Sequence, residues 1–357
     1  MKKLKIAMLA PVEEQVPPKK YGGTELVVYN LTENLVRMGH EVTLFATGDS
    51  KTSAKLVTIF PKAIRTLPQA KDMEVRSSLR LLGVGKVLQY LQENKFDMVH
   101  NHIGSIFLPF AACIDAPVVT TFHGFLKIPN ELEIYKNFAD FNYISISLSQ
   151  RESATAKLNF VSNVYNGIEI EKFNFFPKPK NYFAFLARIS PEKGVLQAIE
   201  IAKMAGVNLI MAGKVDAVDE EFFREKVKPL IDGKQIKFIG EIGHKEKVEL
   251  LGNAKGLLAP IQWEEPFGLY FVEAMICGTP VIANRRGSVA EIVIDGKTGF
   301  IVNDVKEAAA KVKDIEKISR LACHNHVKNN FSAEKMTQEY LKAYEKILEN
   351  SKNKKVV

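Results

Sequence analysis

Short apolar segments typical of β-strands alternate with longer amphipathic segments along this 357-residue chain, and that alternation restricts its fold more than any other feature. In the first half, the pattern predicts strands over residues 5–9, 42–46, 98–101 and 118–122, and helices over 24–37, 75–93 and 106–114. A strand–helix–strand rhythm builds a parallel sheet, because each helix returns the chain to the edge at which the next strand starts. The sequence therefore predicts the α/β class.

The same rhythm starts again after residue 181. It predicts strands over 182–186, 208–212, 236–239, 256–259 and 280–283, and helices near 195–203, 219–231 and 245–253. Residues 171–180 separate the two series, and the prolines and charges there break both periodicities, which indicates a linker. The chain length also suits two domains. We expect two doubly wound, Rossmann-like domains that face each other across a cleft.

The last patterned segment is an amphipathic helix over residues 333–349, which follows Ser332, a favourable N-cap residue. The expected division is a first domain over 1–173, a second domain over 174–332, a C-terminal helix over 333–350 and a charged tail over 351–357. In doubly wound sheets, ligands bind beyond the carboxyl ends of the strands. The residues that carry chemistry are therefore expected in the loops that follow the strands.

Composition excludes several classes of protein. With 46% hydrophobic and 25% charged residues, the chain is not a disordered one. No apolar run approaches the roughly 20 residues that span a bilayer, and the basic N-terminus leads directly into the first strand rather than resembling a signal peptide. Three cysteines at unrelated spacings predict neither a disulfide framework nor a metal site. We expect a cytoplasmic protein with no metal and no other cofactor.

The formal net charge of +8 raises the question of an anionic partner. Because the excess of basic side chains is not confined to one half of the sequence, no nucleic-acid partner is predicted. The helix expected over 75–93 carries Arg76, Arg80 and Lys86, which would suit a lipid head group or a phosphorylated acceptor, although a solvated face is the commoner role. A peripheral contact with the inner membrane surface stays open.

The most informative motif lies in the second half of the chain. It consists of Glu265, Pro266, Phe267, Gly268, Leu269 and, eight positions after the first glutamate, Glu273. The Pro-Phe-Gly turn is followed by a predicted helix, and the first N–H groups of a helix, with their partial positive charge, attract anionic groups. Two carboxylates around such a helix start suit the hydroxyls and phosphates of a sugar nucleotide.

Gly22 and Gly23 open the first helix, immediately after the loop that follows the first strand. Adjacent glycines let a backbone approach a ligand closely, although they also occur in ordinary turns. The dinucleotide pattern Gly-x-Gly-x-x-Gly is absent there, which argues against a nicotinamide site.

Histidines end two predicted strands of the first domain. His100 and His102 lie at the end of one strand and His123 at the end of another, so all three are expected near the ligand edge of the sheet, and His123 is the stronger candidate. His100 and His102 could suggest a metal pair, but no suitably spaced third ligand appears. A lone histidine is more often structural than catalytic.

Two cations follow the first strand of the second domain and precede a helix. Arg188 and Lys193 at that position can neutralise a diphosphate, although exposed basic loops are also common. Gly213 and Ile242 lie in glycine-bearing turns after the next two strands. These turns could line a base and phosphate pocket, or be turns only.

In order and over almost the whole chain, these segments resemble the family 4 glycosyltransferases, retaining enzymes of the GT-B fold that use nucleotide sugars. The resemblance is carried by Gly22-Gly23-Thr24-Glu25, Val99-His100-Asn101-His102, Thr121-Phe122-His123-Gly124, Asn166-Gly167-Ile168, Arg188 to Gly194, and Glu265 to Glu273 with Cys277-Gly278-Thr279-Pro280-Val281. The last of these segments is the specific one.

The resemblance implies a role for each matching residue of the second domain, which would bind the donor. By resemblance, Glu273 holds the ribose hydroxyls, Glu265 contacts the donor sugar, and Arg188 and Lys193 contact the diphosphate. The donor site is expected to include Pro266, Phe267, Gly268 and Leu269 and the turns at Gly213 and Ile242. No metal is implied.

The resemblance also implies that the first domain, on the acceptor side, is completed by the C-terminal helix. Gly22 and Gly23 would approach the donor phosphates, and His123 would face the donor sugar near the reacting centre. The implied activity is sugar transfer from a nucleotide-diphosphate donor to an unnamed acceptor in cell-envelope or glycan biosynthesis. A sugar-nucleotide epimerase of similar fold and a non-enzymatic two-domain binding protein stay open as alternatives.

Overall fold

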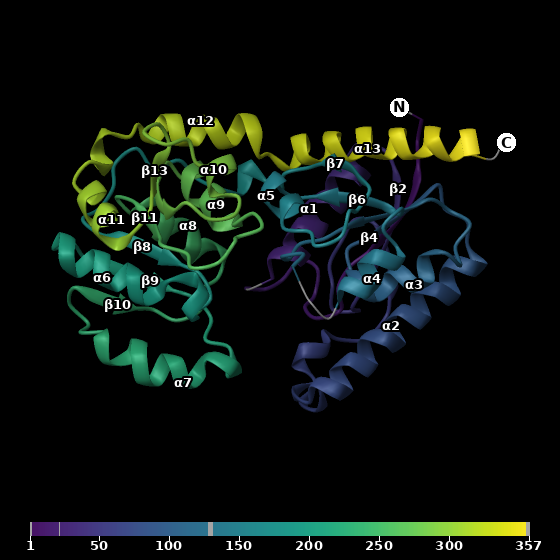
Figure 1. Ribbon diagram of the computed structural model, residues 1–357, viewed down its shortest axis with the longest axis horizontal. Helices are drawn as coiled ribbons and strands as arrows, with labels where there is room; N and C mark the ends of the chain where they lie inside the picture. Colours follow the sequence, from purple (N-terminus) through teal and green to yellow (C-terminus); the bar gives the residue numbers. More distant parts are fainter. Residues whose placement is uncertain (1, 21, 128–130, 355–357) are drawn as a thin grey trace. The chain divides into compact units, whose positions relative to one another are not determined.

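The computed structural model describes residues 2–20, 22–127 and 131–354, and it divides into two compact units (Figure 1). The first unit comprises Met1–Gly167 and Ala333–Val357, and the second comprises Ile168–Ser332. The first unit thus ends at Gly167, whereas the sequence pattern places the boundary after residue 173. Each unit contains one parallel sheet with helices packed against it.

The first unit has a sheet of seven strands in the order β3-β2-β1-β4-β5-β6-β7, all parallel. The strands are β1 Lys5–Leu9, β2 Glu41–Ala46, β3 Lys55–Thr58, β4 Met98–Asn101, β5 Val118–Thr121, β6 Asn142–Ser145 and β7 Phe160–Asn163. Its helices are α1 Gly23–Arg37, α2 Met73–Glu93, α3 Leu108–Ala111, α4 Leu132–Asn137, α5 Leu148–Glu152 and α13 Ala333–Lys354.

The second unit has a sheet of six parallel strands in the order β10-β9-β8-β11-β12-β13. The strands are β8 Phe183–Leu186, β9 Leu209–Ala212, β10 Ile236–Phe238, β11 Leu257–Ala259, β12 Val281–Asn284 and β13 Gly299–Val302. Its α-helices are α6 Val195–Ala205, α7 Glu220–Phe222, α8 His244–Gly252, α9 Leu269–Ile276, α10 Val289–Ile292, α11 Val305–Val312 and α12 Arg320–Asn330. Both sheets are doubly wound, so the α/β, Rossmann-like prediction is confirmed for each unit.

The central strands are buried on both faces, which explains why their sequences do not alternate between apolar and polar residues. In β1 every residue after Lys5 is buried, and β4 and β12 are buried along their whole length. Helices cover both faces of such sheets, so their strands show continuous apolar runs rather than alternation. The expected bounds of β1 and β4 agree with the structure.

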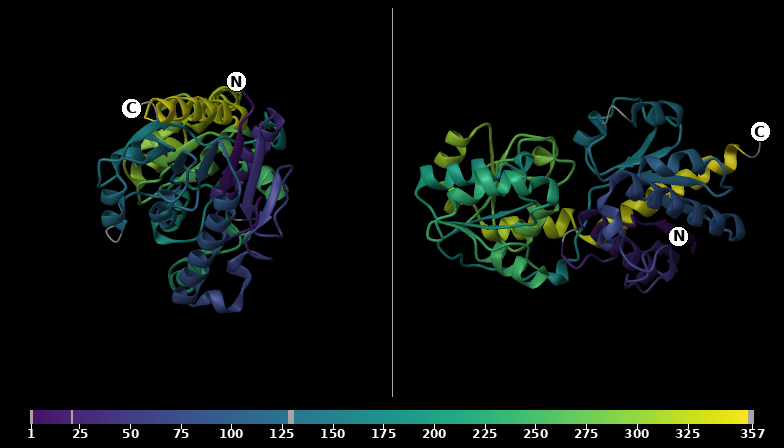
Figure 2. Two further views of the ribbon diagram at one scale, coloured as in Figure 1. Left: turned by 90° about the vertical axis from the view of Figure 1, so that its right-hand side faces the viewer. Right: turned by 90° about the horizontal axis from the view of Figure 1, so that it is seen from below.

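The long C-terminal helix α13 packs against α1 and β7 within the first unit (Figure 2). Its Tyr344 hydroxyl lies 2.6 Å from Nδ1 of His100, and its Met336 sulfur lies 3.0 Å from the backbone nitrogen of Gly167. The helix continues to Lys354, beyond the expected end at residue 349 and into the segment expected to be a tail. Residues 355–357 of that tail lie outside the described residues.

Two expected helices are broken into shorter pieces. Residues 106–114, predicted as one helix, form a 3₁₀ turn followed by the single-turn α3, in which Pro109 occupies the start of the helix. Residues 219–231 form α7, a π-helical turn and a 3₁₀ turn, and Pro229 lies in the last of these. Proline lacks a backbone N–H and its ring clashes with the preceding turn, which explains why each segment is interrupted just before its proline.

Candidate functional site

In the second unit, the direction of the connections reverses between the neighbouring strands β8 and β11. Ligands bind at such switch points because the loops after the two strands diverge there. Gly194, with φ of 76°, packs so tightly that a Cβ would lie 1.9 Å from the Pro260 carbonyl oxygen. The Gln262 N–H also donates to the Glu192 carbonyl oxygen at 2.8 Å. The two loops that carry Lys193 and Glu265 therefore touch directly.

Glu265 is a buried carboxylate held by three donors. The Lys193 ammonium lies 2.6 Å from its Oε2, and both Trp263 Nε1 and the Tyr270 hydroxyl lie 3.2 Å from the same oxygen. The Lys193 nitrogen also lies 4.5 Å from the centre of the Trp263 ring, a cation–π contact. Burial, followed by the charge of Glu265, raises the pKa of Tyr270 well above its usual value, so its hydroxyl stays a donor.

The backbone around Glu265 is fixed by the loop that precedes α10. The Ser288 N–H donates to the Glu265 carbonyl oxygen at 2.9 Å, and the Ser288 hydroxyl donates to the Phe267 carbonyl oxygen at 2.9 Å. A Cβ on Gly287 would lie 2.3 Å from the Glu265 carbonyl oxygen. Pro266 and Phe267 are buried, so the turn that follows Glu265 is anchored in the protein core.

Helix α9 begins immediately after this turn. Gly268 precedes it with φ of 79°, in the left-handed region that favours glycine, and Leu269 is its first residue. No side chain of the described residues caps this N-terminus, so the positive end of the helix dipole is open to an anion.

Glu273 lies on α9 and is also buried, with 4% of its surface exposed. The Lys247 ammonium of α8 forms an ion pair with its Oε1. Lys247 also lies 5.9 Å from the centre of the Phe173 ring. The two motif carboxylates are therefore each held by a lysine from another part of the unit, which is expected of buried charges.

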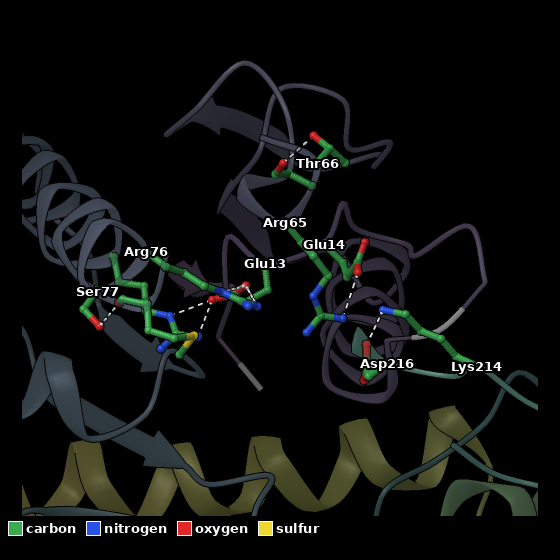
Figure 3. A network of polar contacts seen from close by, with 11 residues as sticks. Glu13, Glu14, Arg65, Thr66, Arg76, Ser77, Lys214 and Asp216 are labelled. Carbon is green, nitrogen blue, oxygen red and sulfur yellow. Dashed lines mark hydrogen bonds and ion pairs between the residues drawn. The ribbon is translucent and has the colours of Figure 1, made fainter. Parts of the chain in front are cut away.

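Arg188 has acidic neighbours that the sequence analysis missed. Its guanidinium forms an ion pair with Glu192, and its Nη1 lies 3.7 Å from Asp216 and 3.8 Å from Asp219. Burial raises the pKa of Asp219, against the effect of Arg188. Lys214 pairs with Asp216 at 2.8 Å (Figure 3). A diphosphate would have to compete with these carboxylates for Arg188.

Gly213 and Ile242 follow β9 and β10 as expected, but the structure gives Gly213 a packing role of its own. A Cβ there would lie 1.7 Å from the Ala187 carbonyl oxygen, and its N–H donates to the Gly240 carbonyl oxygen at 2.9 Å. Only glycine fits against the neighbouring strand at this position. Ile242 is half-buried.

The first unit has its own switch point, between β1 and β4, and a pocket of about 610 Å³ lies there. The loops after β1, β4 and β5 line it, and the lining includes Gly22, Gly23 and His123. Gly22, with φ of 146°, could carry no Cβ, since one would lie 2.7 Å from the Pro18 Cβ. The structure therefore brings these three predicted residues to one cavity.

Glu25, the last residue of the Gly-Gly-Thr-Glu motif, also lines this pocket. It lies in the first turn of α1 and is 5% exposed. Burial raises the pKa of its carboxyl group to about 7. A carboxyl group in this environment is partly protonated at neutral pH.

His100 and His102 are buried, His123 is half-buried beside them, and all three are hydrogen-bonded within the protein. Nδ1 of His102 lies 2.8 Å from Nε2 of His123, and Nε2 of His100 lies 2.8 Å from the Thr121 hydroxyl. Burial lowers the pKa of His123 to about 4, so it is neutral at physiological pH. Among the described residues, no group of histidine, cysteine and acidic side chains is arranged to hold a metal ion. Nε2 of His102 has no partner in the described part of the chain.

Several site residues were not identified from the sequence: Glu25, His102 as the partner of His123, Lys247, Trp263 and Tyr270. Trp263 and Tyr270 flank Glu265, and Trp263 is the only tryptophan of the chain, so their position beside the motif was an available signal. Lys247 belongs to a helix rich in charged residues, and nothing in its local pattern distinguishes it.

Two family models match adjoining parts of the chain. One, described as Glycosyltransferase Family 4, covers residues 21–172, and the other, Glycosyl transferases group 1, covers residues 167–332. A curated relative, phosphatidyl-myo-inositol mannosyltransferase from Mycolicibacterium smegmatis, is 26% identical over 326 residues. That match covers 84% of this chain and 81% of the relative.

Solved structures share the fold at low sequence identity. Sucrose-phosphate synthase from Thermosynechococcus elongatus has a TM-score of 0.80 at 19% identity, covering 97% of this chain and 99% of that one. HepE from Anabaena, in complex with UDP and glucose, has a TM-score of 0.68 at 21% identity, covering 95% and 98%.

Proposed function

Because this chain belongs to the family 4 glycosyltransferases, retaining enzymes of the GT-B fold, we propose that its second unit binds the nucleotide-diphosphate-sugar donor between Glu265 and Glu273. The enzyme moves a sugar from such a donor to an acceptor and keeps the anomeric configuration. The family match favours transfer over a sugar-nucleotide epimerase or a non-enzymatic binding protein. One observation carries the donor site: two buried carboxylates, each held by a lysine, flank the uncapped N-terminus of α9.

In this proposal Glu273 accepts hydrogen bonds from the ribose hydroxyls and Glu265 from the donor sugar. Carboxylates are acceptors only, and sugar hydroxyls are donors, so the pairing is chemically matched. Lys247 and Lys193 hold the two carboxylates in place before the donor arrives. Such preorganisation avoids reorganisation when the transition state forms.

Departure of the diphosphate builds negative charge that the second unit is equipped to stabilise. Lys193 has three N–H donors, of which the contact with Glu265 uses one, so a phosphate oxygen can share the same ammonium. Arg188 would exchange its carboxylate partners for the diphosphate, and the Gly268–Leu269 end of α9 would add backbone donors. Each such donor is worth about 2.7–4 kcal/mol of barrier.

The first unit carries the remaining candidate residues. Gly22 and Gly23 let the backbone approach the phosphates, and His123 faces the reacting sugar. Since His123 is neutral at physiological pH, it acts through hydrogen bonds and does not supply a proton as an imidazolium. Attack of the acceptor on the same face as the departing phosphate, which takes the acceptor's proton, retains the configuration without a covalent enzyme intermediate.

A donor screen followed by a turnover assay tests the proposal. The full-length protein is heated with UDP, GDP, ADP and their sugar conjugates, without metal and then with Mg²⁺. One base should raise the melting temperature, because a ligand of the native state stabilises it. The matching sugar nucleotide is then supplied with a panel of acceptors, and the product anomer is read by NMR. An inverted product would contradict the assignment.

Variants locate the site. Lys193→Ala and Glu265→Ala should remain folded and lose turnover, whereas Lys255→Ala should not. Lys255 pairs with Glu316 at 2.8 Å in the same unit, with side chains that are 29% and 69% exposed, and so serves as a matched control. Full activity in both site variants would refute the donor site.

We further propose a peripheral contact between α2 and a lipid surface. This helix exposes Met73, Val75, Leu81 and Leu82, at 37–60% of their surface. None of the described helices is both long enough and apolar enough to cross a bilayer. Cosedimentation with neutral vesicles should be reduced by Leu81→Asp, and an absolute requirement for anionic lipid would contradict an apolar contact.

A further inference from the structure

The wall of the pocket in the first unit carries charges that sugar transfer does not itself explain. The charged side chains of its described lining are Glu13, Glu14, Glu25, Glu131, Arg65 and Arg80. A volume of about 610 Å³ lies within the roughly 300–1,000 Å³ of small-molecule sites. The pocket is therefore large and polar enough to hold a small-molecule ligand, and the charges that line it decide which class of ligand fits.

Both arginines of the wall are bound by glutamates. Arg65 Nη1 donates to Glu14 at 3.0 Å (Figure 3). Arg80 Nε donates to Glu13 at 2.6 Å. Arg76, one turn before Arg80 on α2, donates to the same Glu13 carboxylate from its Nε at 3.0 Å. These two arginines lower the pKa of Glu13 in spite of its burial, which keeps the carboxylate charged.

The third cation of α2 is also engaged. The Lys86 ammonium donates to the Ile59 carbonyl oxygen at 2.8 Å and lies 4.7 Å from the centre of the Phe60 ring. Arg76, Arg80 and Lys86, which were candidates for binding a phosphorylated acceptor, thus all contact groups of the protein itself. Even with Arg76 counted, three arginines stand against four glutamates, so the described wall has no excess of positive charge.

The same wall offers groups that suit hydroxyls. His102 is 3% exposed and lines the pocket, and its Nε2 has no partner among the described residues. In either tautomer a neutral imidazole can bond a hydroxyl, which both donates and accepts. The Glu25 carboxyl group lies in the first turn of α1 on the same pocket.

We propose that this pocket binds an uncharged polyhydroxylated group, a sugar or cyclitol ring without phosphate, and that this group carries the hydroxyl that accepts the transferred sugar. The identification of the group as the acceptor rests on the proposed transfer function. Hydroxyls can bridge paired carboxylates and guanidinium groups without adding net charge. A phosphate bound among these glutamates would meet like charges, which weakens its binding.

Saturation-transfer NMR on the full-length protein tests this. One mixture contains neutral probes: myo-inositol, methyl glucoside, methyl mannoside and maltose. The other contains myo-inositol 1-phosphate and the 1- and 6-phosphates of glucose and mannose. We expect neutral probes to bind and phosphorylated ones to bind about tenfold more weakly. His102→Ala should weaken the neutral probes, which places them in this pocket.

A charge variant gives a second, independent measurement. Glu14→Gln removes the carboxylate that holds Arg65, so phosphorylated probes should bind about tenfold more tightly than to the wild type. Glu93→Gln, an exposed change at the C-terminal end of α2 outside the pocket, should change neither class of probe. Three results would each overturn the proposal. The wild type binds phosphorylated probes as tightly as neutral ones or more tightly, it binds no neutral probe, or Glu14→Gln leaves the binding of phosphorylated probes unchanged.

Failure of the proposed donor site and failure of this inference give different results. If UDP, GDP and ADP all fail to bind while the neutral probes bind, the proposed function fails and the chemistry assigned to the pocket stands. If a nucleotide binds and the enzyme transfers sugar to phosphorylated acceptors in preference to neutral ones, the function stands and this inference fails.

Discussion

Replacing Glu25 by glutamine should stabilise the protein more at pH 8 than at pH 5. Burial raises the pKa of this carboxyl group from 4.5 to about 7. A raised folded-state pKa means that the folded protein holds the proton more tightly than the unfolded chain. Stability from this group is therefore fully present below pH 4.5 and is lost as the pH rises from 4.5 through 7. Glutamine does not ionise, so the variant loses nothing over this window.

The magnitude follows from the two pKa values. Their difference, 7 minus 4.5, is about 2.5 pKa units, which corresponds to about 3.5 kcal/mol well above pH 7 at roughly 1.4 kcal/mol per unit. At pH 5 the same pKa values give about 1 kcal/mol, so the advantage of the variant should grow by about 2.5 kcal/mol between pH 5 and pH 8. Any pH-independent effect of the amide cancels in this difference.

The assay is urea denaturation, in which hydrogen exchange of peptides from β1 and β2 measures the unfolding of the first unit. Fluorescence of Trp263, the only tryptophan, measures the unfolding of the second unit, and its urea midpoint should be the same in the variant and the wild type. Glu93→Gln, an exposed carboxylate of the first unit, is the matched control. A stability difference between Glu25→Gln and the wild type that is the same at pH 5 and pH 8 would refute the raised pKa.

Three further predictions concern the two sites. Gly194→Ala should destabilise the second unit by about 3 kcal/mol or more in thermal unfolding, because its Cβ would meet the Pro260 carbonyl oxygen at 1.9 Å; an unchanged melting temperature would contradict this close contact. Lys247→Ala should weaken nucleotide binding in calorimetry about tenfold by leaving Glu273 unpaired, and Lys247→Arg should restore part of it; equal affinity in both variants and the wild type would exclude a role for the pair. Because the pKa of His123 is about 4, the pH dependence of turnover between pH 6 and pH 8 should be the same in His123→Gln and the wild type. A titration in this range that the wild type shows and the variant lacks would mean that the histidine becomes charged there.

The sequence was sufficient to predict the buried strands but not the edge strands of the first sheet. β1 is an apolar run after Lys5, and β4 is buried throughout, with two apolar residues before His100 and Asn101. β3 and β7 are only partly buried and contain polar residues, so neither shows a clear pattern. The short helices α4 and α5 span too few turns for a helical period to be visible.

For the site, the sequence predicted positions but not partners. Glu265 and Lys193 follow strands that adjoin at a switch point, and this could be inferred from the order of elements. The pairing of Glu273 with Lys247 joins α9 to α8, and only tertiary packing brings these two helices together. The acids around Arg188 include Asp216 and Asp219, which lie beyond the next strand and are equally invisible in the local pattern.

The most direct test of the donor site is a crystal structure of the protein with the nucleoside diphosphate that raises its melting temperature. The account predicts ribose hydroxyls within about 3.2 Å of the Glu273 carboxylate, with the diphosphate against Lys193 and the N-terminus of α9. A nucleotide bound elsewhere, with Lys247 and Lys193 still paired to the two glutamates and no ligand beside them, would contradict it.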